Sequence, residues 1–276
     1  MRMDLGKAAQ IIDMICEGVG IRAVERLSKV NRHTILDLLE TVGRKCQTFL
    51  DTRIRKVSVE SVQCDEVFGF VGLKEVNNRL NDPNLGTQYL FLGVDRKSKL
   101  ILSFHVGKRT GENAGIFMAD LKKRIKPDSQ VTTDGFQGYL SAMYNAFGSR
   151  VHFAQQIKTY FNYGTPNPPK PHTHRRYSPE GVKSVRTLVH IGNPDQQKIS
   201  TSHVERLNLS ARLFQRRLTR LTLGFSKKIE NLRFSLAIFI CHFNWVRVHS
   251  AHGLTPANSS GLTDRPWSTL ELLRNL

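Results

Sequence analysis

The stretch from residue 200 to residue 220 carries one acidic side chain, Glu205, among five arginines. At about 100° per residue, Glu205, Asn208, Arg212 and Arg216 fall on one polar face of a helix whose opposite face is apolar. A carboxylate in this setting either forms an ion pair with Arg212 or binds a metal ion beside a phosphate that the arginines hold. For this stretch alone, a solvated charged face with Glu205 near the helix start is the simpler interpretation.

Two aspartates occupy positions at which carboxylates are uncommon, because each lies in or at the end of a predicted strand. Asp65 falls in the alternating segment 57–67, and Asp134 ends the short strand 130–134. Adjacent parallel strands can bring two such carboxylates within a few ångströms, and a following helix can add Glu205. Three carboxylates repel one another unless a cation lies between them, and oxygen ligands favour Mg²⁺ or Mn²⁺. Taken singly, each aspartate could also be a turn or cap residue.

The net charge of +18 lies mostly after residue 147. A localised basic surface of this size indicates a polyanionic partner, of which nucleic acid is the commonest. A generally basic protein without such a partner is the alternative. Lys227 and Lys228, in the first turn of a predicted apolar helix over 225–249, oppose the helix dipole, and a phosphate partner would explain them better than stability does.

The cysteines and the hydropathy pattern exclude other classes. The four cysteines form no Cys-x-x-Cys pair, so neither a zinc ribbon nor a disulfide framework is expected. His172 and His174 have no cysteine or acidic companions nearby, so a loop is a better interpretation there than a metal site. The longest apolar run, 236–246, is far shorter than the roughly 20 residues of a membrane span, and no signal peptide opens the chain. A soluble, intracellular protein is expected.

The elements that must position these side chains divide into two domains. Residues 1–56 read as three short helices, and a brief connection over 28–32 separates the second from the third. This spacing is typical of a helix-turn-helix, whose second helix, capped by Asn31, would offer Arg32 and His33 to a DNA major groove. A small three-helix bundle that binds nothing is the alternative. The helices are expected over 8–16, 21–27 and 33–42.

Residues 57–276 alternate strands and helices and predict an α/β fold. Three strands joined by hairpins, followed by helix, strand, helix and strand, form a mixed sheet with helices packed on its faces. Glu66, next to Asp65, should point to the opposite face of the sheet and is interpreted as structural. Residues 158–200 are a Pro-rich basic insertion without regular structure, suited to gripping a nucleic-acid backbone. We expect strands over 57–67, 89–95, 100–106, 130–134 and 151–157, and helices over 113–125, 136–147, 200–220, 225–249 and 268–273.

Several short motifs are spread over most of the chain in a fixed order. They include Gln63-Cys64-Asp65-Glu66-Val67, Thr132-Thr133-Asp134-Gly135, Ser202-His203-Val204-Glu205-Arg206 and Phe225-Ser226-Lys227-Lys228. In this order they resemble the transposases of the IS1 family, which belong to the DDE group and have a ribonuclease H-like catalytic domain. The first segment is also similar to the helix-turn-helix of that family.

The resemblance implies that Asp65, Asp134 and Glu205 are the catalytic acidic triad and the metal ligands. It implies two Mg²⁺ or Mn²⁺ ions that support cutting of a DNA strand and its joining to a target phosphodiester. Double-stranded DNA and further copies of the chain would be the partners, in the cytoplasm of a bacterium or archaeon. The residues expected to bind DNA are Asn208, Arg212, Arg216, Lys227, Lys228, Arg32 and His33.

Two other functions stay open at this point. One is a domesticated regulator that binds DNA through the N-terminal helices without cutting it. The other is a ribonuclease H-like nuclease that cuts without joining. The presence of all three acids argues against the regulator, because a chain used only for binding has no need of them.

Overall fold

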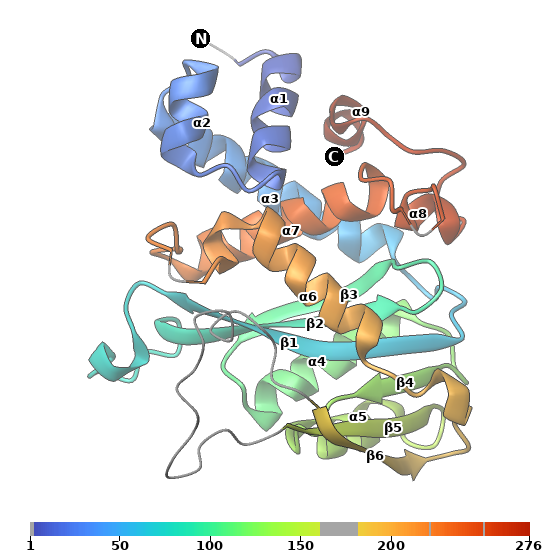
Figure 1. The fold of residues 1–276 in the computed structure, drawn as a ribbon. Coiled ribbons are helices and arrows are strands. Elements are labelled where there is room, and N and C mark those ends of the chain that lie inside the picture. Colours follow the sequence, from blue (N-terminus) through green and yellow to red (C-terminus); the bar gives the residue numbers. More distant parts are fainter. Residues whose placement is uncertain (1–2, 161–181, 221, 251) are drawn as a thin grey trace.

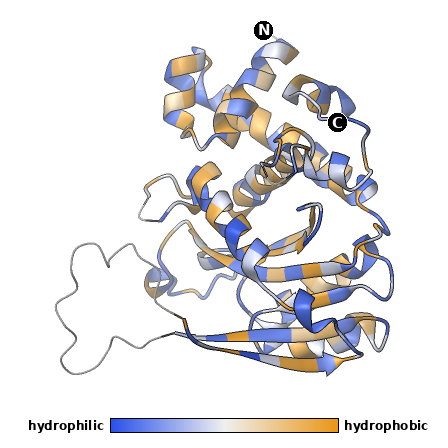
Figure 2. Ribbon diagram, turned by 45° about the vertical axis from the view of Figure 1, so that its right-hand side comes forward, coloured by the Kyte–Doolittle hydropathy of each residue, from blue (hydrophilic) through white to orange (hydrophobic). Residues whose placement is uncertain are grey.

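Six chain segments build the centre of the molecule, a six-stranded mixed sheet (Figure 1). The computed structural model describes residues 3–160, 182–220, 222–250 and 252–276. In Figure 2, hydrophobic and hydrophilic residues alternate along the strands, as expected where successive side chains point to opposite faces. The predicted α/β class with a mixed sheet flanked by helices is confirmed.

The strand order is β3-β2-β1-β4-β5-β6. The first three strands form an antiparallel meander, and β4 then lies parallel to both β1 and β5. β6 closes the sheet antiparallel to β5. The bounds are β1 Ser61–Val71, β2 Gly86–Asp95, β3 Ile101–Gly107, β4 Gln130–Thr133, β5 His152–Tyr160 and β6 Val182–Ile191. The parallel pair of β1 and β4 therefore lies at the middle of the sheet.

Helices cover both faces of the sheet. α4 (Gly111–Arg124) and α5 (Gly138–Phe147) pack side by side on one face, and α6 (Ser202–Phe214) crosses β1 and β2 on the other (Figure 1). The long apolar helix α7 (Ile229–Trp245) is buried along nearly its whole length. The chain ends with α8 (Pro256–Ser259) and α9 (Thr269–Asn275), and α9 packs on α1. Short 3-10 helices occur at Glu75–Asn77, Gln196–Lys198 and Arg216–Leu218.

The N-terminal region is helical, as predicted, but its third helix is much longer than expected. The three helices are α1 (Leu5–Cys16), α2 (Ile21–Ser28) and α3 (Arg32–Arg53). The Asn31 side chain caps α3 by accepting a hydrogen bond from the His33 amide at 2.9 Å. α3 continues beyond residue 42 because its second half buries apolar side chains against α7, and that packing outweighs the low helix propensity of Gly43.

The prediction that residues 158–200 lack regular structure is wrong for their described parts. β5 runs to Tyr160, and β6 occupies Val182–Ile191. Most side chains of β6 are exposed, so the strand lacks the buried alternation that would have identified it. The first strand also starts at Ser61 rather than at residue 57, and Val57 forms only an isolated bridge with Ile125. Residues 161–181, with His172 and His174, lie outside the described residues.

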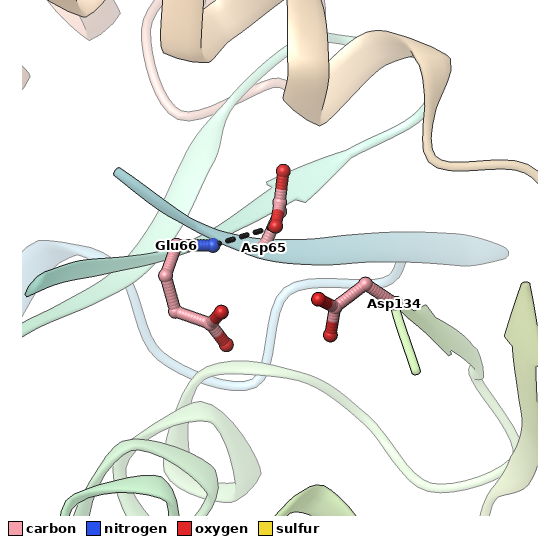
Figure 3. Close-up of side chains that lie close together, drawn as sticks. All are labelled: Asp65, Glu66 and Asp134. Atoms are coloured by element: carbon pink, nitrogen blue, oxygen red, sulfur yellow. Dashed lines mark hydrogen bonds between the residues drawn. The ribbon is translucent and has the colours of Figure 1, made fainter. Parts of the chain in front are cut away.

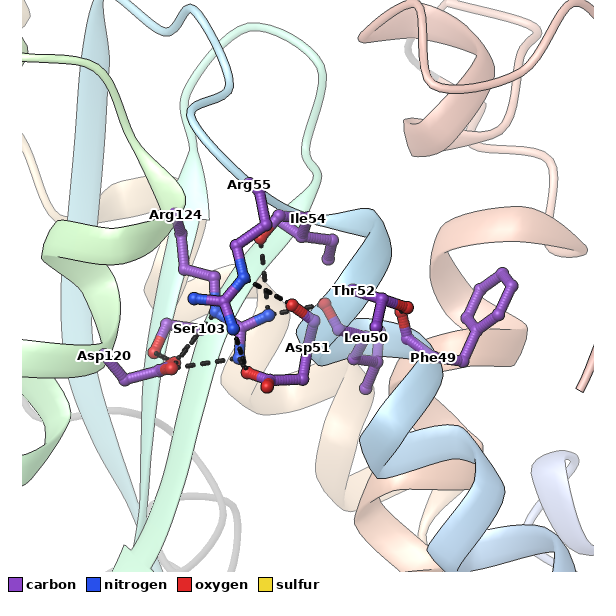
Figure 4. Close-up of polar contacts among 9 residues, drawn as sticks. All are labelled: Phe49, Leu50, Asp51, Thr52, Ile54, Arg55, Ser103, Asp120 and Arg124. Carbon is purple, nitrogen blue, oxygen red and sulfur yellow. Dashed lines mark hydrogen bonds and ion pairs between the residues drawn. The ribbon is translucent and has the colours of Figure 1, made fainter.

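Arg124, at the end of α4, joins the helical region to the sheet (Figure 4). Its guanidinium donates to Asp51 Oδ1 and Asp120 Oδ1, each at 2.9 Å. It also donates to the carbonyl oxygens of Leu50 and Ile54 at the end of α3. One buried side chain thus fixes α3 against α4.

Within the described part of the chain, no helix is long and apolar enough to cross a membrane.

Candidate metal centre

The parallel pairing of β1 and β4 places Asp65 beside Asp134. In this register Cys64 lies opposite Thr133, so each aspartate follows directly after a paired residue. One carboxylate oxygen of Asp65 lies within 4.8 Å of one of Asp134, so the two aspartates meet at the middle of the sheet, as the sequence led us to expect.

Three carboxylates meet at this point, and Glu66 is the third (Figure 3). One oxygen from each of Asp65, Glu66 and Asp134 lies within 4.8 Å of the other two. In Figure 3 the side chains of Asp65 and Glu66 leave β1 in opposite directions, as expected for a strand, but the longer Glu66 side chain brings its carboxylate to the Asp134 side. We expected a structural role for Glu66 from its place on the strand, but its carboxylate lies with those of Asp65 and Asp134.

Asp65 is held in a defined orientation. Its Oδ2 accepts a hydrogen bond from Asn208 Nδ2 at 2.7 Å, and its Oδ1 accepts one from the Glu66 amide at 2.8 Å. Burial, followed by the charge of Asp134, raises the pKa of Asp65 to about 7. Asn208, which we expected to contact DNA, here orients a carboxylate of the candidate centre.

Asp134 and Glu66 share a cation, Arg109. The Arg109 guanidinium donates to Glu66 Oε2 and to Asp134 Oδ2, each at 3.0 Å, and lies 4.3 Å from the centroid of the Phe136 ring. Burial raises the pKa of both carboxyl groups despite this partner, and the charge of Asp134 adds to the effect on Glu66. Burial therefore outweighs the effect of the Arg109 cation at both carboxyl groups.

Glu66 Oε1 is the atom that this arrangement leaves without a normal partner. The Glu66 side chain is only 3% exposed. The buried Tyr139 hydroxyl faces Glu66 and lowers its pKa, yet neither this hydroxyl nor Oε1 has a hydrogen-bond partner of normal geometry. A buried carboxylate oxygen without a partner is costly, and a hard cation would satisfy it. The donor atoms present thus fit a divalent ion such as Mg²⁺ or Mn²⁺.

Glu205 approaches the carboxylates from α6. Thr201 Oγ1 donates to Glu205 Oε1 at 2.6 Å, and Lys158 of β5 forms an ion pair with the same oxygen. Glu205 is not among the three residues whose oxygens lie within 4.8 Å of one another, but its charge raises the pKa of Asp65 and of Asp134. Glu205 therefore borders the group, with Lys158 bound to the carboxylate that we expected to bind a metal.

The strand that carries Asp65 also fixes the start of α6. Gln63, two residues earlier on the same face of β1, is fully buried, and its Oε1 accepts hydrogen bonds from the amides of His203 and Val204 at 2.8 and 3.2 Å. These amides lack partners within the helix, so Gln63 acts as the cap of α6. The relative positions of Asp65 and Glu205 are thus set by one strand.

The expected polar stripe on α6 is only partly present. An ion pair between Glu205 and Arg212 is absent, because Arg212 Nη1 donates to the carbonyl oxygens of Phe68 and Leu218 instead, at 3.2 and 3.4 Å. α6 ends at Phe214 rather than at residue 220, so Arg216 lies on a separate 3-10 helix and leaves the stripe.

The end of α6 has a local cause at Gln215. This residue is extended and buried, and its Oε1 accepts a hydrogen bond from Ser235 Oγ of α7 at 2.8 Å. The chain therefore turns away from the helix axis to keep Gln215 inside. Sequence periodicity carries no sign of this contact, because it comes from a helix 20 residues further along the chain.

The other basic residues expected at DNA lie on the surface. Lys227 and Lys228 are exposed and precede α7, so their placement in its first turn was wrong, and the acid Glu230 occupies that turn in agreement with the helix dipole. Arg32 and His33 are exposed at the start of α3, across the short connection from α2. The structure leaves all four side chains accessible to a ligand.

Sequence reasoning missed Arg109 and Lys158 as parts of the site. Arg109 belongs to the connection between β3 and α4, and the motif Arg109-Thr110 is part of the resemblance to IS1-family transposases, but no role was expected for it. Lys158 fell in the segment that was interpreted as irregular, so its place on β5 was not foreseen.

Neither a protein-family model nor a curated protein matches the chain, so its geometry is the basis for assigning a function.

Proposed function

We propose that the protein is a DNA transposase of the DDE group, with a ribonuclease H-like catalytic domain. The observation that supports this best is the register of β1 and β4, which sets Asp65 beside Asp134, while Gln63 of the same strand anchors the helix that carries Glu205. A resemblance to IS1-family transposases through the motifs around these three acids agrees with the proposal.

Asp65, Asp134 and Glu205 would hold two divalent ions, with Glu66 as a further oxygen donor within reach. Such ions lower the pKa of a bound water and stabilise charge on a phosphate, which is the chemistry that cutting and joining of DNA require. Asn208 keeps Asp65 oriented, and among the described residues each Asp65 oxygen accepts one hydrogen bond. Lys158 forms an ion pair with Glu205, and Arg109 forms one with Asp134.

Double-stranded DNA is the proposed partner, and a homo-oligomer on two DNA ends is the proposed assembly. The excess of positive charge supports a polyanionic ligand. Arg212, Arg216, Lys227 and Lys228 would bind the backbone near the metal centre. The region around Arg32 and His33 would read DNA sequence through a helix-turn-helix.

One reaction distinguishes this proposal from the two alternatives. Labelled duplex DNA from the inverted repeats that flank the coding sequence is incubated with the protein, Mg²⁺ and a plasmid target. A transposase yields strand-transfer products, a ribonuclease H-like nuclease yields cleavage without joining, and a regulator yields a complex alone. We expect strand transfer.

Glu205→Gln tests the assignment of the third acid. The variant keeps the size of the side chain and its acceptor for Thr201, so we expect unchanged DNA binding and loss of strand cleavage in Mg²⁺. The matched control is Glu230→Gln, which removes an exposed acid on α7 and should cleave like the wild type. Cleavage by Glu205→Gln at the wild-type rate would show that Glu205 is not a catalytic acid.

A further inference from the structure

Basic side chains from three separate segments meet beside the first turn of α6. Lys99 Nζ, from the turn between β2 and β3, lies 3.2 Å from His203 Nδ1 of α6. The rings of His249 and His252, from the segment after α7, lie 5.3 Å apart, and His252 Nε2 lies 3.2 Å from the Ser98 carbonyl oxygen of the same turn. The α6 basic cluster, as we call it, consists of Arg96, Lys99, His203, Arg206, His249 and His252.

The charges of the cluster act on one another. Burial, followed by the positive charges of Lys99 and Arg96, lowers the pKa of His203. Burial, followed by His252, Lys99 and Arg206, lowers the pKa of His249. Lys99 Nζ lies 3.2 Å from His203 Nδ1, and Arg206 follows His203 by three positions on α6, so these groups lie close enough to share one anion.

The arginine and lysine side chains of the cluster form no ion pair with an acid of the described residues. The acid that acts on both Lys99 and His203 is Asp95, but it is 4% exposed and accepts hydrogen bonds from Ser98 N at 2.7 Å and Ser98 Oγ at 2.6 Å. The Asp95 carboxylate thus stabilises the turn through these hydrogen bonds.

The turn holds Lys99 in an uncommon conformation. Its φ of +64° lies in the left-handed region, which favours glycine or asparagine over lysine. The Lys99 ammonium group donates to the Arg96 carbonyl oxygen and lies beside His203, so the turn holds this charge next to the first turn of α6. Lys99, His203, His249 and His252 are partly exposed and Arg206 is exposed, so a large ligand can reach them.

The backbone at the start of α6 does not supply the anion site. The amides of His203 and Val204 donate to Gln63, and the amide of Ser202 donates to Ser200 Oγ. A ligand here would therefore bind through side chains. His203 and Glu205 are two positions apart on one helix, about 200° around its axis, so the cluster and the metal centre lie on different sides of the same turn.

We propose that the α6 basic cluster binds a backbone phosphate of double-stranded DNA, through Lys99 and Arg206 with His203 and His249 as further donors. The identity of the ligand rests on the proposed function, since DNA supplies the phosphate. A phosphate bound on this side of α6 fixes the DNA relative to Glu205 without touching the metal centre. The cluster is thus a positioning site for the duplex and separate from the carboxylates.

Lys99→Gln is the variant that tests the proposal. Binding of a fluorescent 30-base-pair duplex is measured by anisotropy at several salt concentrations, without divalent ions. Loss of one phosphate contact should weaken binding by roughly 5- to 10-fold at low salt and reduce the slope of log affinity against log salt by about 1. Arg206→Gln, an exposed change on α6 that cannot disturb the turn, should have the same effect.

Lys97→Gln is the matched control, because Lys97 is an exposed lysine of the same turn outside the cluster. It should retain the wild-type salt slope. Equal affinity and slope for wild type, Lys99→Gln and Arg206→Gln would overturn the cluster proposal while leaving the proposed function standing. Failure of the wild type to bind any duplex would overturn both.

Inorganic phosphate separates DNA from a small anion as the ligand. The melting temperature of wild type and Lys99→Gln is measured with and without phosphate. If phosphate stabilises only the wild type while duplex affinity is equal in the two proteins, the cluster binds a free anion, and the DNA proposal is overturned. We expect a loss of duplex affinity in Lys99→Gln, whatever the response to phosphate.

Discussion

The pKa of Asp65 reflects the electrostatics of the candidate centre. Asp65 lies among Glu66, Asp134 and Glu205, all of which raise its pKa in addition to burial. Its hydrogen bonds, one from Asn208 and one from the backbone, do not offset these effects. The folded protein without metal ions therefore binds a proton at Asp65 that the unfolded chain would release near pH 4.

This difference predicts a pH-dependent gain in stability from Asp65→Asn. Because the folded-state pKa is about 7, above the unfolded value, the contribution of Asp65 to the free energy of unfolding falls as pH rises from about 4 to about 7. The variant has no ionisable group at this position, so its stability does not fall in this pH range. The buried Oδ1 of Asn208, which has no hydrogen-bond partner, can accept a hydrogen bond from the new amide. In EDTA at pH 8 we expect a gain of roughly 2–4 kcal/mol.

Urea unfolding at pH 8 and at pH 4 measures this effect. The gain should shrink toward zero at pH 4, where the wild-type carboxyl group is protonated in the folded state. Asp264→Asn, at an exposed acid, should change stability at neither pH. An Asp65→Asn variant that is less stable than the wild type at pH 8 would contradict the pKa on which the account of the centre depends.

At the scale of elements, α3 and α7 approach each other more closely than side chains normally allow. Gly43 of α3 faces Phe234 of α7, and a Cβ atom at position 43 would lie 2.3 Å from Phe234 Cβ and 2.7 Å from Phe234 Cα. Real Cβ atoms do not make such contacts, so an alanine here would push the helices apart. The glycine in the middle of α3 therefore has a packing cause.

Gly43→Ala should destabilise the protein even though alanine favours helices. The gain in helix propensity is about 1 kcal/mol, and the cost of overpacking is about 1–3 kcal/mol or more where backbone atoms must move. We expect a net loss, measured as the free energy of unfolding in urea. Gly115→Ala is the control in α4, where a Cβ would have nothing within 4 Å, and it should stabilise by about 0.5–1 kcal/mol. Equal effects of the two changes would contradict the close approach.

Sequence reasoning worked best where the pattern had a local cause. The strands around Asp65 and Asp134 alternate or stop at a turn, and this was enough to place both acids at neighbouring positions of one sheet. β6 was missed because its side chains are mostly exposed, and α6 was extended too far because Gln215 is drawn inside by Ser235. Arg109 and Lys158 come to the site through tertiary contacts, which periodicity does not encode.

At the scale of the whole molecule, the fold gathers acids at the middle of the sheet and bases around them. Asp65 and Asp134 come from the central parallel strands, whereas Lys158 and Lys99 lie toward the two sides of α6. Such an arrangement favours a polyanion whose phosphates are drawn to the bases, while the carboxylates need a cation before a phosphate can approach them. The division into domains at residue 56 and the oligomeric state stay predictions.

Asp134→Asn tests most directly whether these carboxylates form a metal-dependent centre for DNA cleavage. The measurement is the single-turnover rate of cleavage of labelled inverted-repeat DNA, in Mg²⁺ and in EDTA, with duplex affinity measured in parallel. We predict that the wild type cleaves only in Mg²⁺ and that Asp134→Asn binds DNA normally but cleaves roughly 10³-fold more slowly or not at all. Wild-type cleavage in EDTA, or cleavage by Asp134→Asn at the wild-type rate, would show that they do not form such a centre.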